Sequence, residues 1–567
     1  MKSGAVSSQE LPEKYRMLGG RGLSARILLD EVPADCDPLG PSNKLIFAPG
    51  LLAGTYLSSA NRISVGSKSP LTGGIKESNG GGVTALRLAQ LGYGALIIEE
   101  KPGPGEWYYL VVSEDQVVLK PAGDLVGLGC FAAARSLRQQ WGNKAALAVI
   151  GAAGENRMNI AGIAHADQEG LPTRYSARGG LGAVMGAKGL KAIVILPAKQ
   201  SRVSYADGNL WRELAMKYYA NLRSNETTAV TMPKFGTALT MELVDSLGGV
   251  PTRNFSAGRF EKAGEIGGVR LREVILARGG EGDPAHACMP GCVVKCSNRY
   301  PDAEGKLLNT PMEYENNVFL GSNLGIGDLD TIGRLNYLCN DLGVDVIETG
   351  ASMAVAMEAG LADFGDGSAA ADMLQQIGQG TELGLKLGQG ALRAGKFFGI
   401  GRVAAFKGQT IGGYDPRALK VNGVTYASSP MGGDHTAGNG IFVKTDHLDP
   451  AGKVELSRNL QITSAWVDSL GLCTFVRVIH TGDPEILPGL ANARYGAAWD
   501  ADDLTALGKR VLGWELEFNR RAGLEKTAAV PEFLRQDPLA PHNSVFDVPE
   551  SELKEIWHEL GAEDSAK

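Results

Sequence analysis

The 567-residue sequence lacks the features that mark membrane, secreted and nucleic-acid-binding proteins. It has no run of about 18 apolar residues, so we expect no membrane-spanning helix. Its opening segment, MKSGAVSSQELPEKYR, has no apolar stretch of the kind found in signal peptides. The formal net charge of −7 excludes nucleic acid as a main partner, because a basic footprint is missing.

Cysteine is also scarce, with only 7 residues in the chain. So few cysteines do not form a disulfide framework in a chain of this size, and we therefore expect a reducing, cytoplasmic location. Apolar residues make up 44% and charged residues 21%. These values are typical of soluble globular proteins and exclude disorder for most of the chain. The length predicts about two to four domains.

Glycine is the one residue type in excess, at 77 of 567 positions, which is roughly twice the usual share of about 7%. The glycines follow no repeating period, so the sequence is not collagen-like. A glycine excess in a globular chain indicates many tight turns and close approach of the backbone to something flat or bulky.

The pattern of apolar residues changes near residue 199. Before it, short β-prone runs alternate with Gly- and Pro-bearing turns, at 44–52, 62–68, 94–100, 107–119 and 190–198. After it, apolar residues recur at helical spacing, at 209–223, 370–395 and 507–523. The order predicts an α+β protein, with a β-rich domain of antiparallel or mixed strands over 1–199 and one or two helical domains after it. The last residues, 561–567, are expected to fray.

Three cysteines stand at intervals of four in HACMPGCVVKCSN: Cys288, Cys292 and Cys296. Thiolates gathered this tightly are soft ligands for zinc or an iron–sulfur cluster. The alternative is three unligated cysteines on one helical face, but Pro290 and Gly291 oppose a regular helix there. Either metal site normally needs a fourth ligand. The candidates are Cys36, Cys130, Cys339, Cys473 and His286.

Two segments about 130 residues apart are near-copies of one pattern: CNDLGVD at 339–345 and VDSLGLC at 467–473. Each predicts a helix C-terminus closed by glycine. Helix capping explains why each segment contains the glycine, but not why the whole pattern occurs twice. A pair of equivalent turns could bind two equivalent halves of a ligand. Cys473 ends the second copy, which makes it the best candidate for the fourth thiolate.

Glycine-rich stretches at 58–82, 176–195 and 428–435 remain. The second imitates a dinucleotide fingerprint, but its glycine spacing is wrong and it precedes a strand. Backbone amides and basic side chains in these loops suit an anionic ligand, the alternative being surface turns with solvated charges. The polar side chains concerned are Arg62, Lys76, Asn79, Arg174 and Arg178.

Taken together, these segments resemble the tungsten-containing aldehyde:ferredoxin oxidoreductase family. The resemblance runs in the family's order through nearly the whole chain. It is carried by LGGRGLSARILLDEVP (18–33), LTGGIKESN (71–79), RGGLGAVMGAKGLKAI (178–193), the cysteine segment, PMEYE (311–315), NDLGVD (340–345), YDPRALK (414–420), MGGDH (431–435), DSLGLC (468–473) and EFNRRAG (517–523).

The resemblance implies a β-rich pterin-binding domain over 1–199, a helical domain with the iron–sulfur cysteines over 200–400, and a helical C-terminal domain over 401–567. It implies one tungsten held by two pterins, with magnesium bridging the pterin phosphates, and one [4Fe–4S] cluster. Molybdenum would use the same pterin and similar ligands. The implied cluster ligands are Cys288, Cys292, Cys296 and Cys473. The implied cofactor-binding residues are Arg62, Lys76, Asn79, Gly80, Gly81, Arg174, Arg178, Gly179, Gly180, Asn340, Asp341, Gly343, Asp345, Asp468, Gly471 and Leu472.

The implied activity is oxidation of an aldehyde to its carboxylic acid, with electrons passing through the cluster to ferredoxin or an electron-transfer subunit. Glu313 or Glu315 of PMEYE and His435 of MGGDH match the family's proposed acid–base residues. The alternatives are a catalytic subunit that runs a low-potential reduction of an acid or acyl group in a larger complex, a metal-free paralogue, and a zinc protein. Family members occur as monomers, homodimers and hetero-complexes.

The sequence departs from the family in three places. The cysteines read C-x3-C-x3-C where the family commonly shows C-x2-C-x3-C, so we expect a bulged turn at Met289–Gly291 to absorb the extra residue. A radical S-adenosylmethionine enzyme would need C-x3-C-x2-C. Ala177 replaces a glycine before Arg178. The strand expected before Leu18 is represented only by the opening segment, either because it is missing or because the start is misassigned.

Overall fold

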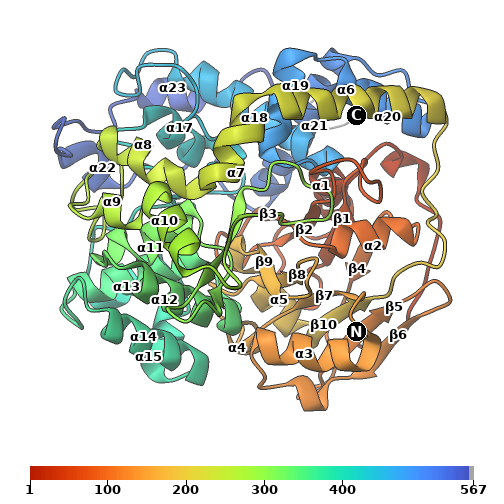
Figure 1. The fold of residues 1–567 in the computed structure, drawn as a ribbon, viewed down its shortest axis with the longest axis horizontal. Helices are drawn as coiled ribbons and strands as arrows, with labels where there is room; N and C mark the ends of the chain where they lie inside the picture. Colours follow the sequence, from red (N-terminus) through yellow and green to blue (C-terminus); the bar gives the residue numbers. More distant parts are fainter. Residues whose placement is uncertain (561–567) are drawn as a thin grey trace.

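Two β-sheets occupy residues 45–195 and lie in the centre and lower right of Figure 1. The computed structural model describes residues 1–560. The first sheet has four antiparallel strands in the order β3-β2-β1-β4. Their bounds are β1 Leu45–Pro49, β2 Ile63–Lys68, β3 Ile75–Gly80 and β4 Leu96–Ile98.

The second sheet has six strands in the order β6-β5-β10-β7-β8-β9. β5 and β10 run parallel and the other neighbours run antiparallel, so the sheet is mixed. The central strand β10 is buried along its whole length, as its continuous apolar run LKAIVI requires. The bounds are β5 Tyr108–Val112, β6 Val117–Pro121, β7 Ala146–Val149, β8 Ile163–Ala166, β9 Pro172–Ser176 and β10 Leu190–Ile195.

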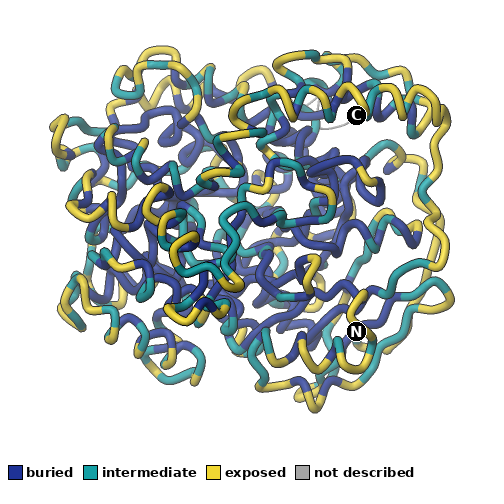
Figure 2. The backbone as a smooth tube through the Cα atoms, in the orientation of Figure 1, coloured by how far each residue is buried: buried dark blue, intermediate teal, exposed yellow. Residues whose placement is uncertain are grey.

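Five α-helices accompany the sheets: α1 Gly20–Glu31, α2 Thr84–Gln90, α3 Cys130–Trp141, α4 Ala152–Glu155 and α5 Leu181–Ala187. Helix α1 packs on β2 and also against two helices from the far end of the chain, α18 and α21. Because α1 joins the two regions, the β-rich part and the C-terminal helices share one hydrophobic core. Figure 2 shows that the buried backbone runs through the interior while exposed segments lie on the periphery.

The rest of the chain is mainly helical, and two small sheets interrupt it. The helices up to residue 400 are α6 Gly208–Ser224, α7 Met232–Phe235, α8 Thr240–Ser246, α9 Ala263–Ile266, α10 Gly268–Arg278, α11 Tyr314–Phe319, α12 Leu329–Leu342, α13 Val346–Glu358, α14 Gly367–Gln379, α15 Glu382–Leu387 and α16 Ala391–Phe398. The later ones are α17 Lys420–Ser428, α18 Lys453–Leu470, α19 Arg477–Gly482, α20 Ile486–Tyr495, α21 Ala501–Arg521, α22 Glu532–Gln536 and α23 Glu550–Glu555. The small sheets are β11 Asp283–His286, β12 Ser297–Pro301 and β13 Leu307–Asn309, and β14 Ala405–Phe406 with β15 Gln409–Thr410.

The architecture confirms the predicted fold class, a β-rich N-terminal part followed by helical parts. Every predicted β-prone run contains a strand. The predicted helix over 370–395 is wrong as a single element, because it is divided into α14, α15 and α16 at Gly380 and Gly390, both of which have positive φ. Residues 1–12 form no helix or strand. The predicted frayed tail, 561–567, lies outside the described residues.

No single helix within residues 1–560 is long and apolar enough to cross a membrane. One pair, Lys453–Leu470 with Thr474–Gly482, meets the length and composition criteria together but is bent by 111°. The first member, α18, packs against α1, α17 and α21.

Candidate active site and metal centre

The three clustered cysteines lie in the loop that joins β11 to β12. The strands pair antiparallel with His286 opposite Ser297, so residues 287–296 form the tip of a hairpin. The tip contains Gly291 at φ 75 and Lys295 at φ 43, which a regular helix does not allow. The helical-face alternative for the cysteines is therefore wrong. The turn at Gly291 is where the sequence predicts a bulge for the extra residue.

Cys473 is the fourth thiol of this group. Its backbone N–H donates to the Ser59 carbonyl at 2.8 Å, and the Ser59 hydroxyl lies 3.3 Å from the Cys292 sulfur. Burial raises the pKa of Cys473, and the neighbouring Arg62 guanidinium opposes this effect. A hydrogen bond from Cys288 lowers the pKa of Cys292 to about 6 despite burial.

The remaining cysteines lie elsewhere in the fold. Cys130 begins α3 and Cys339 lies within α12, both fully buried. Cys36 follows α1, where Lys68 donates to its carbonyl. Both ring nitrogens of His286 have hydrogen-bond partners, Nδ1 with Arg174 and Nε2 with Glu169. Of the other cysteines, only Cys473 lies beside the cysteine loop through these contacts, and His286 borders the loop but has a protein partner at each ring nitrogen.

The spacing of the thiols can be compared with what one zinc ion would require. A zinc ion with Zn–S bonds of about 2.3 Å holds its sulfurs about 3.8 Å apart. Over residues 1–560, the one group of three or more ligand side chains whose atoms all lie within 4.8 Å of one another is Asp167, Glu169 and His286, without a cysteine. No three of the described thiols are therefore gathered as closely as one zinc would hold them, although Cys288 and Cys292 lie at hydrogen-bond distance.

The two repeated turns have the same geometry and both face the β-rich part. Gly343 caps α12 at φ 73 and Gly471 caps α18 at φ 77, as the sequence predicts. The Gly343 carbonyl accepts from the Gly162 N–H at 2.9 Å, and the Gly471 carbonyl accepts from the Arg62 N–H at 3.1 Å. The β-rich part is thus held between two equivalent helix ends.

Gly471→Ala is expected to lower the free energy of unfolding by about 2–5 kcal/mol. A side chain at positive φ costs about 1–2 kcal/mol, and its Cβ would lie 2.8 Å from the Gly50 Cα, which adds about 1–3 kcal/mol for overpacking. The matched control is Gly523→Ala, at φ 75 with no atom within 4 Å of the added Cβ. Thermal unfolding of both variants tests this, and equal midpoints would contradict it.

The basic side chains of the glycine loops divide into two groups. Arg62 donates to both the side chain and the carbonyl of Asn79 and lies near Cys473 and Cys288. Lys76 and Arg178 instead bond to protein groups. Lys76 pairs with Asp434, while Arg178 pairs with Asp345 at 3.1 Å and donates to the carbonyls of Gly433 and Thr410.

The other predicted cofactor residues line the same loops. Gly81 follows β3, and a Cβ there would lie 3.6 Å from the Cys288 sulfur, while Gly80 packs on His165. Gly179 lies over the Lys76 side chain and Gly180 against Asn159.

In the turns, several predicted residues serve capping or pairing roles. Asp341 accepts from the Phe131 N–H at 3.1 Å, and Asp345 caps α13 through the Ile347 N–H. Asn340 donates to the Asn309 side chain at 3.0 Å. Asp468 pairs with Arg21, and Leu472 is fully buried.

Glu313 and Glu315 lie at the start of α11 but have different surroundings. Glu313 is the N-cap residue, and one of its carboxylate oxygens is 4.0 Å from the Arg174 guanidinium. Glu315 accepts from the Gly413 N–H at 2.9 Å, and its other oxygen lies 3.4 Å from His435 Nε2. Only Glu315 therefore forms a carboxylate–imidazole pair.

Burial shifts the pKa values of this pair in opposite directions. It raises the pKa of Glu315 to about 8 and lowers the pKa of His435 to about 4. In the described part of the chain, Glu315 Oε1 and His435 Nδ1 are buried without a hydrogen-bond partner. The pair is therefore largely neutral at neutral pH and keeps free polar atoms for another molecule.

Sequence reasoning missed several residues around this pair. Asp434 precedes His435; burial would raise its pKa, but the charges of Lys76 and Arg178 outweigh that effect and hold it low. The Tyr414 ring lies 5.6 Å from the His435 ring. Asp434 and Tyr414 lie within the family segments MGGDH and YDPRALK, so their place in these motifs could have identified them from the sequence.

Tyr426, near Glu315, and Glu77, near Asp468, were also missed. The Tyr426 hydroxyl is buried, and within residues 1–560 it has no hydrogen-bond partner. Burial and the neighbouring Asp468 raise the pKa of Glu77 to about 8. Glu77 belongs to LTGGIKESN, whereas no pattern in the sequence singles out Tyr426.

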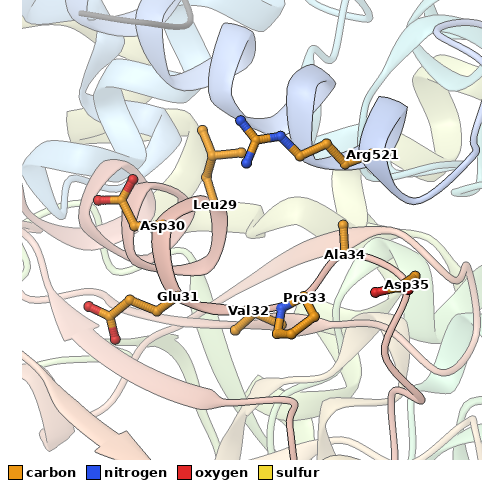
Figure 3. Close-up of a pocket in the computed structure, with 8 residues that line it drawn as sticks. All are labelled: Leu29, Asp30, Glu31, Val32, Pro33, Ala34, Asp35 and Arg521. Atoms are coloured by element: carbon orange, nitrogen blue, oxygen red, sulfur yellow. The ribbon is translucent and has the colours of Figure 1, made fainter.

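A surface hollow of about 380 Å³ lies at the end of α1 (Figure 3), lined by Leu29, Asp30, Glu31, Val32, Pro33, Ala34, Asp35 and Arg521. None of these residues belongs to the cysteine group, the turns or the Glu315–His435 pair. Two of its three carboxylates are already paired, Asp30 with Lys14 and Arg26, and Glu31 with Lys44. The candidate site is therefore the buried region between β3, α11, α12 and α18.

Comparison with known proteins accounts for this arrangement. A model of the aldehyde ferredoxin oxidoreductase N-terminal domain matches residues 1–197, and a model of domains 2 and 3 of the same family matches residues 213–562. The chain belongs to the aldehyde ferredoxin oxidoreductase family. This confirms the resemblance predicted from the sequence motifs and identifies the chain as an oxidoreductase of the tungsten-enzyme type.

Individual relatives span nearly the whole chain. The tungsten-containing aldehyde ferredoxin oxidoreductase of Thermococcus kodakarensis is 32% identical over 95% of this chain and 91% of the relative. The WOR-like subunit of an aliphatic sulfonate oxidoreductase from Pyrococcus furiosus is 28% identical over 83% of this chain and 77% of the relative. The BamBC active-site complex of benzoyl coenzyme A reductase has the same fold, with a TM-score of 0.80 at 22% identity over 99% of this chain and 93% of that chain.

Membership of the family implies a tungsten–pterin cofactor and an iron–sulfur cluster, and the residues present fit both. Four thiols, three on one loop and the fourth beside it, supply the four ligands that an iron–sulfur cluster needs. Buried polar atoms that lack partners among the described residues, Glu315 Oε1, His435 Nδ1 and Arg174 Nε, are expected beside a bound group. Gly81 lies against Cys288, so the glycine loop and the cysteine loop are adjacent.

Proposed function

We propose that this oxidoreductase converts an aldehyde to its carboxylic acid and passes the electrons through a cluster on Cys288, Cys292, Cys296 and Cys473 to a one-electron acceptor. The supporting observation is the Glu315–His435 pair, which lies within the family segments PMEYE and MGGDH and keeps unpartnered polar atoms. A tungsten–pterin group supplies the two-electron chemistry when bound.

Two glycine-capped turns and the Asn79–Gly81 loop would hold the pterins, with Arg62 between the loop and Cys473. A magnesium ion would take oxygen ligands, which the Asn79 side chain and the carbonyls of this loop could supply. We assign Lys76 and Arg178 a supporting role, since their partners are Asp434 and Asp345 rather than open space.

The overall reaction balances as an aldehyde plus water giving a carboxylic acid, two protons and two electrons. The ionised form of Glu315 would accept a proton from the water that adds to the carbonyl carbon, and its raised pKa of about 8 makes that form a stronger base than an ordinary carboxylate. His435 Nδ1, which has no partner among the described residues, would donate a hydrogen bond that polarises the carbonyl oxygen. Tyr414, whose ring lies tilted beside the His435 ring, would limit access of water.

The test is turnover of an aldehyde panel with a viologen dye, using protein purified without oxygen from a tungstate-supplied host. We expect acid and reduced dye in a 1:2 ratio, because one aldehyde yields two electrons and each dye takes one. Protein that contains tungsten and iron yet oxidises no aldehyde would contradict the proposal.

A second candidate is the catalytic subunit of a larger complex running a low-potential reduction of an acid or acyl group. It is favoured by the 28% identity to a WOR-like subunit. Co-purification of a tagged chain with another iron–sulfur polypeptide from its own host would support it. A metal-free paralogue is disfavoured, because the four thiols and both glycine turns are present.

The acceptor would dock where the cysteine loop reaches the surface. Exposed Lys295 lies within the loop, and exposed Lys234 lies on α7, whose Met232 packs against Cys292. Tyr56 is 81% exposed, and its carbonyl lies 3.7 Å from the Cβ position of Gly291. An exposed aromatic ring with flanking lysines suits an acidic iron–sulfur carrier.

Reversing both charges, with Lys234→Glu and Lys295→Glu, is expected to raise the KM for an acidic ferredoxin on the order of tenfold at low salt. Turnover with the viologen dye should stay unchanged, because a small dye needs no docking surface. Lys144→Glu, an exposed charge beyond α3, is the matched control. An unchanged KM in the double variant would place the acceptor elsewhere.

A further inference from the structure

A chain of polar contacts leads from the cysteine group to the surface. The Arg174 guanidinium donates to the Ser297 hydroxyl at 2.7 Å and to His286 Nδ1 at 3.0 Å. On the other side of the ring, His286 Nε2 lies 3.0 Å from a carboxylate oxygen of Glu169. Arg174 is 4% exposed, whereas Glu169 is in contact with solvent. This set is called the Arg174 brace below.

The chemistry of the brace determines the histidine tautomer. A guanidinium can only donate, so His286 Nδ1 must carry the lone pair and Nε2 must carry the hydrogen. Nε2 then donates to Glu169. Although Asp167, Glu169 and His286 offer ligand atoms within 4.8 Å of one another, Nε2 has no lone pair left for a cation. The group is therefore a positioning device and not a metal site.

The brace holds the Arg174 guanidinium near the cysteine thiolates and away from a direct ion pair with Glu313. Its guanidinium acts electrostatically on Cys288, Cys296 and Glu313, and it is 4.0 Å from the Glu313 carboxylate. Both terminal nitrogens are held on the side of Ser297 and His286, while Nε has no partner among the described residues. Without the contacts to Ser297 and His286, we expect the guanidinium to move the short distance to Glu313 and form a direct ion pair with it.

We propose that the Arg174 brace tunes the reduction potential of the iron–sulfur cluster, with Arg174 as a positioning charge held by His286 and Glu169. This rests on the proposed function. Each electron that enters the cluster comes from aldehyde oxidation, adds one negative charge, and leaves to the one-electron acceptor. A fixed guanidinium beside the thiolates stabilises the more negative, reduced form and so raises its potential.

The test is a redox titration of the holoenzyme, following the cluster by electron paramagnetic resonance. Arg174→Gln is expected to lower the equilibrium constant for reduction of the cluster about tenfold, which is 59 mV for one electron. Arg174→Lys, which keeps the charge, should recover part of this shift. An Arg174→Gln potential equal to that of the wild type would overturn the proposal.

Glu169 gives a second, surface-side test that does not depend on replacing a buried arginine. Glu169→Ala removes the acceptor for His286, while Glu169→Gln keeps one, and both remove the same charge. We expect the alanine variant to have the lower potential of the two, and equal potentials would overturn the positioning role. Glu304→Gln, on an exposed turn, should leave the potential unchanged.

Measurements on the wild-type protein distinguish failure of the proposed function from failure of the Arg174 brace. If its iron content and resonance signal show no cluster, the proposed function fails. If the cluster is present and the Arg174 and Glu169 variants retain the wild-type potential, the brace fails and the proposed function is unaffected. If Arg174→Gln does not retain its cluster, the Glu169 pair decides the outcome.

Discussion

Glu315→Gln is expected to lower kcat by about 10²–10⁴-fold, the usual contribution of a positioned acid–base group. The amide keeps the size of the side chain and can still accept from the Gly413 N–H, but it cannot take a proton. Steady-state turnover of an aldehyde with a viologen dye measures the effect. Tungsten and iron contents must match those of the wild type, so that the loss is assigned to proton transfer.

The pH profile provides a second measure of the same residue. Because the ionised form is the base, kcat should rise with pH and level off above the raised pKa of about 8. Glu315→Gln should remove this dependence. The matched control is Glu313→Gln, two residues away and next to Arg174, which should retain the pH dependence. Loss of the profile in Glu313→Gln but not in Glu315→Gln would reverse the assignment.

Cys473→Ala is expected to abolish electron transfer to a protein acceptor, with iron falling well below the about four atoms of a complete cluster. Its thiol is the one contributed by the C-terminal helices, next to the second glycine turn. Iron analysis and the resonance spectrum of the reduced protein check the result. Alanine is preferred to serine, because a serine oxygen could still bind iron.

Cys339→Ala is the control for that variant. Cys339 is fully buried in α12, away from the cysteine loop, and its loss should affect packing without removing iron. If Cys473→Ala kept a full complement of iron while Cys339→Ala lost it, the fourth ligand would be wrongly assigned.

Local sequence rules predicted the elements that depend on neighbouring residues. The β-prone runs became strands, since apolar runs such as 190–195 need burial on both faces. The glycines of the two near-copies became helix caps, because Gly343 and Gly471 take positive φ that other residues avoid. The hairpin turn at Gly291 followed from Pro290 and Gly291 opposing a helix.

The roles of charged residues could not be predicted in the same way. Lys76 and Arg178 stand in glycine loops that suit an anion, yet their partners Asp434 and Asp345 lie far along the chain. Such pairings are set by tertiary contacts, which a local pattern does not encode. The choice between Glu313 and Glu315 has the same origin, since their positions on α11 direct them to Arg174 and His435 respectively.

The most direct test of the account is metal analysis of the chain purified without oxygen from a tungstate-supplied host. We predict about one tungsten and about four irons per chain, with pterin recovered from the same sample. Zinc alone, or iron without tungsten and pterin, would contradict the account.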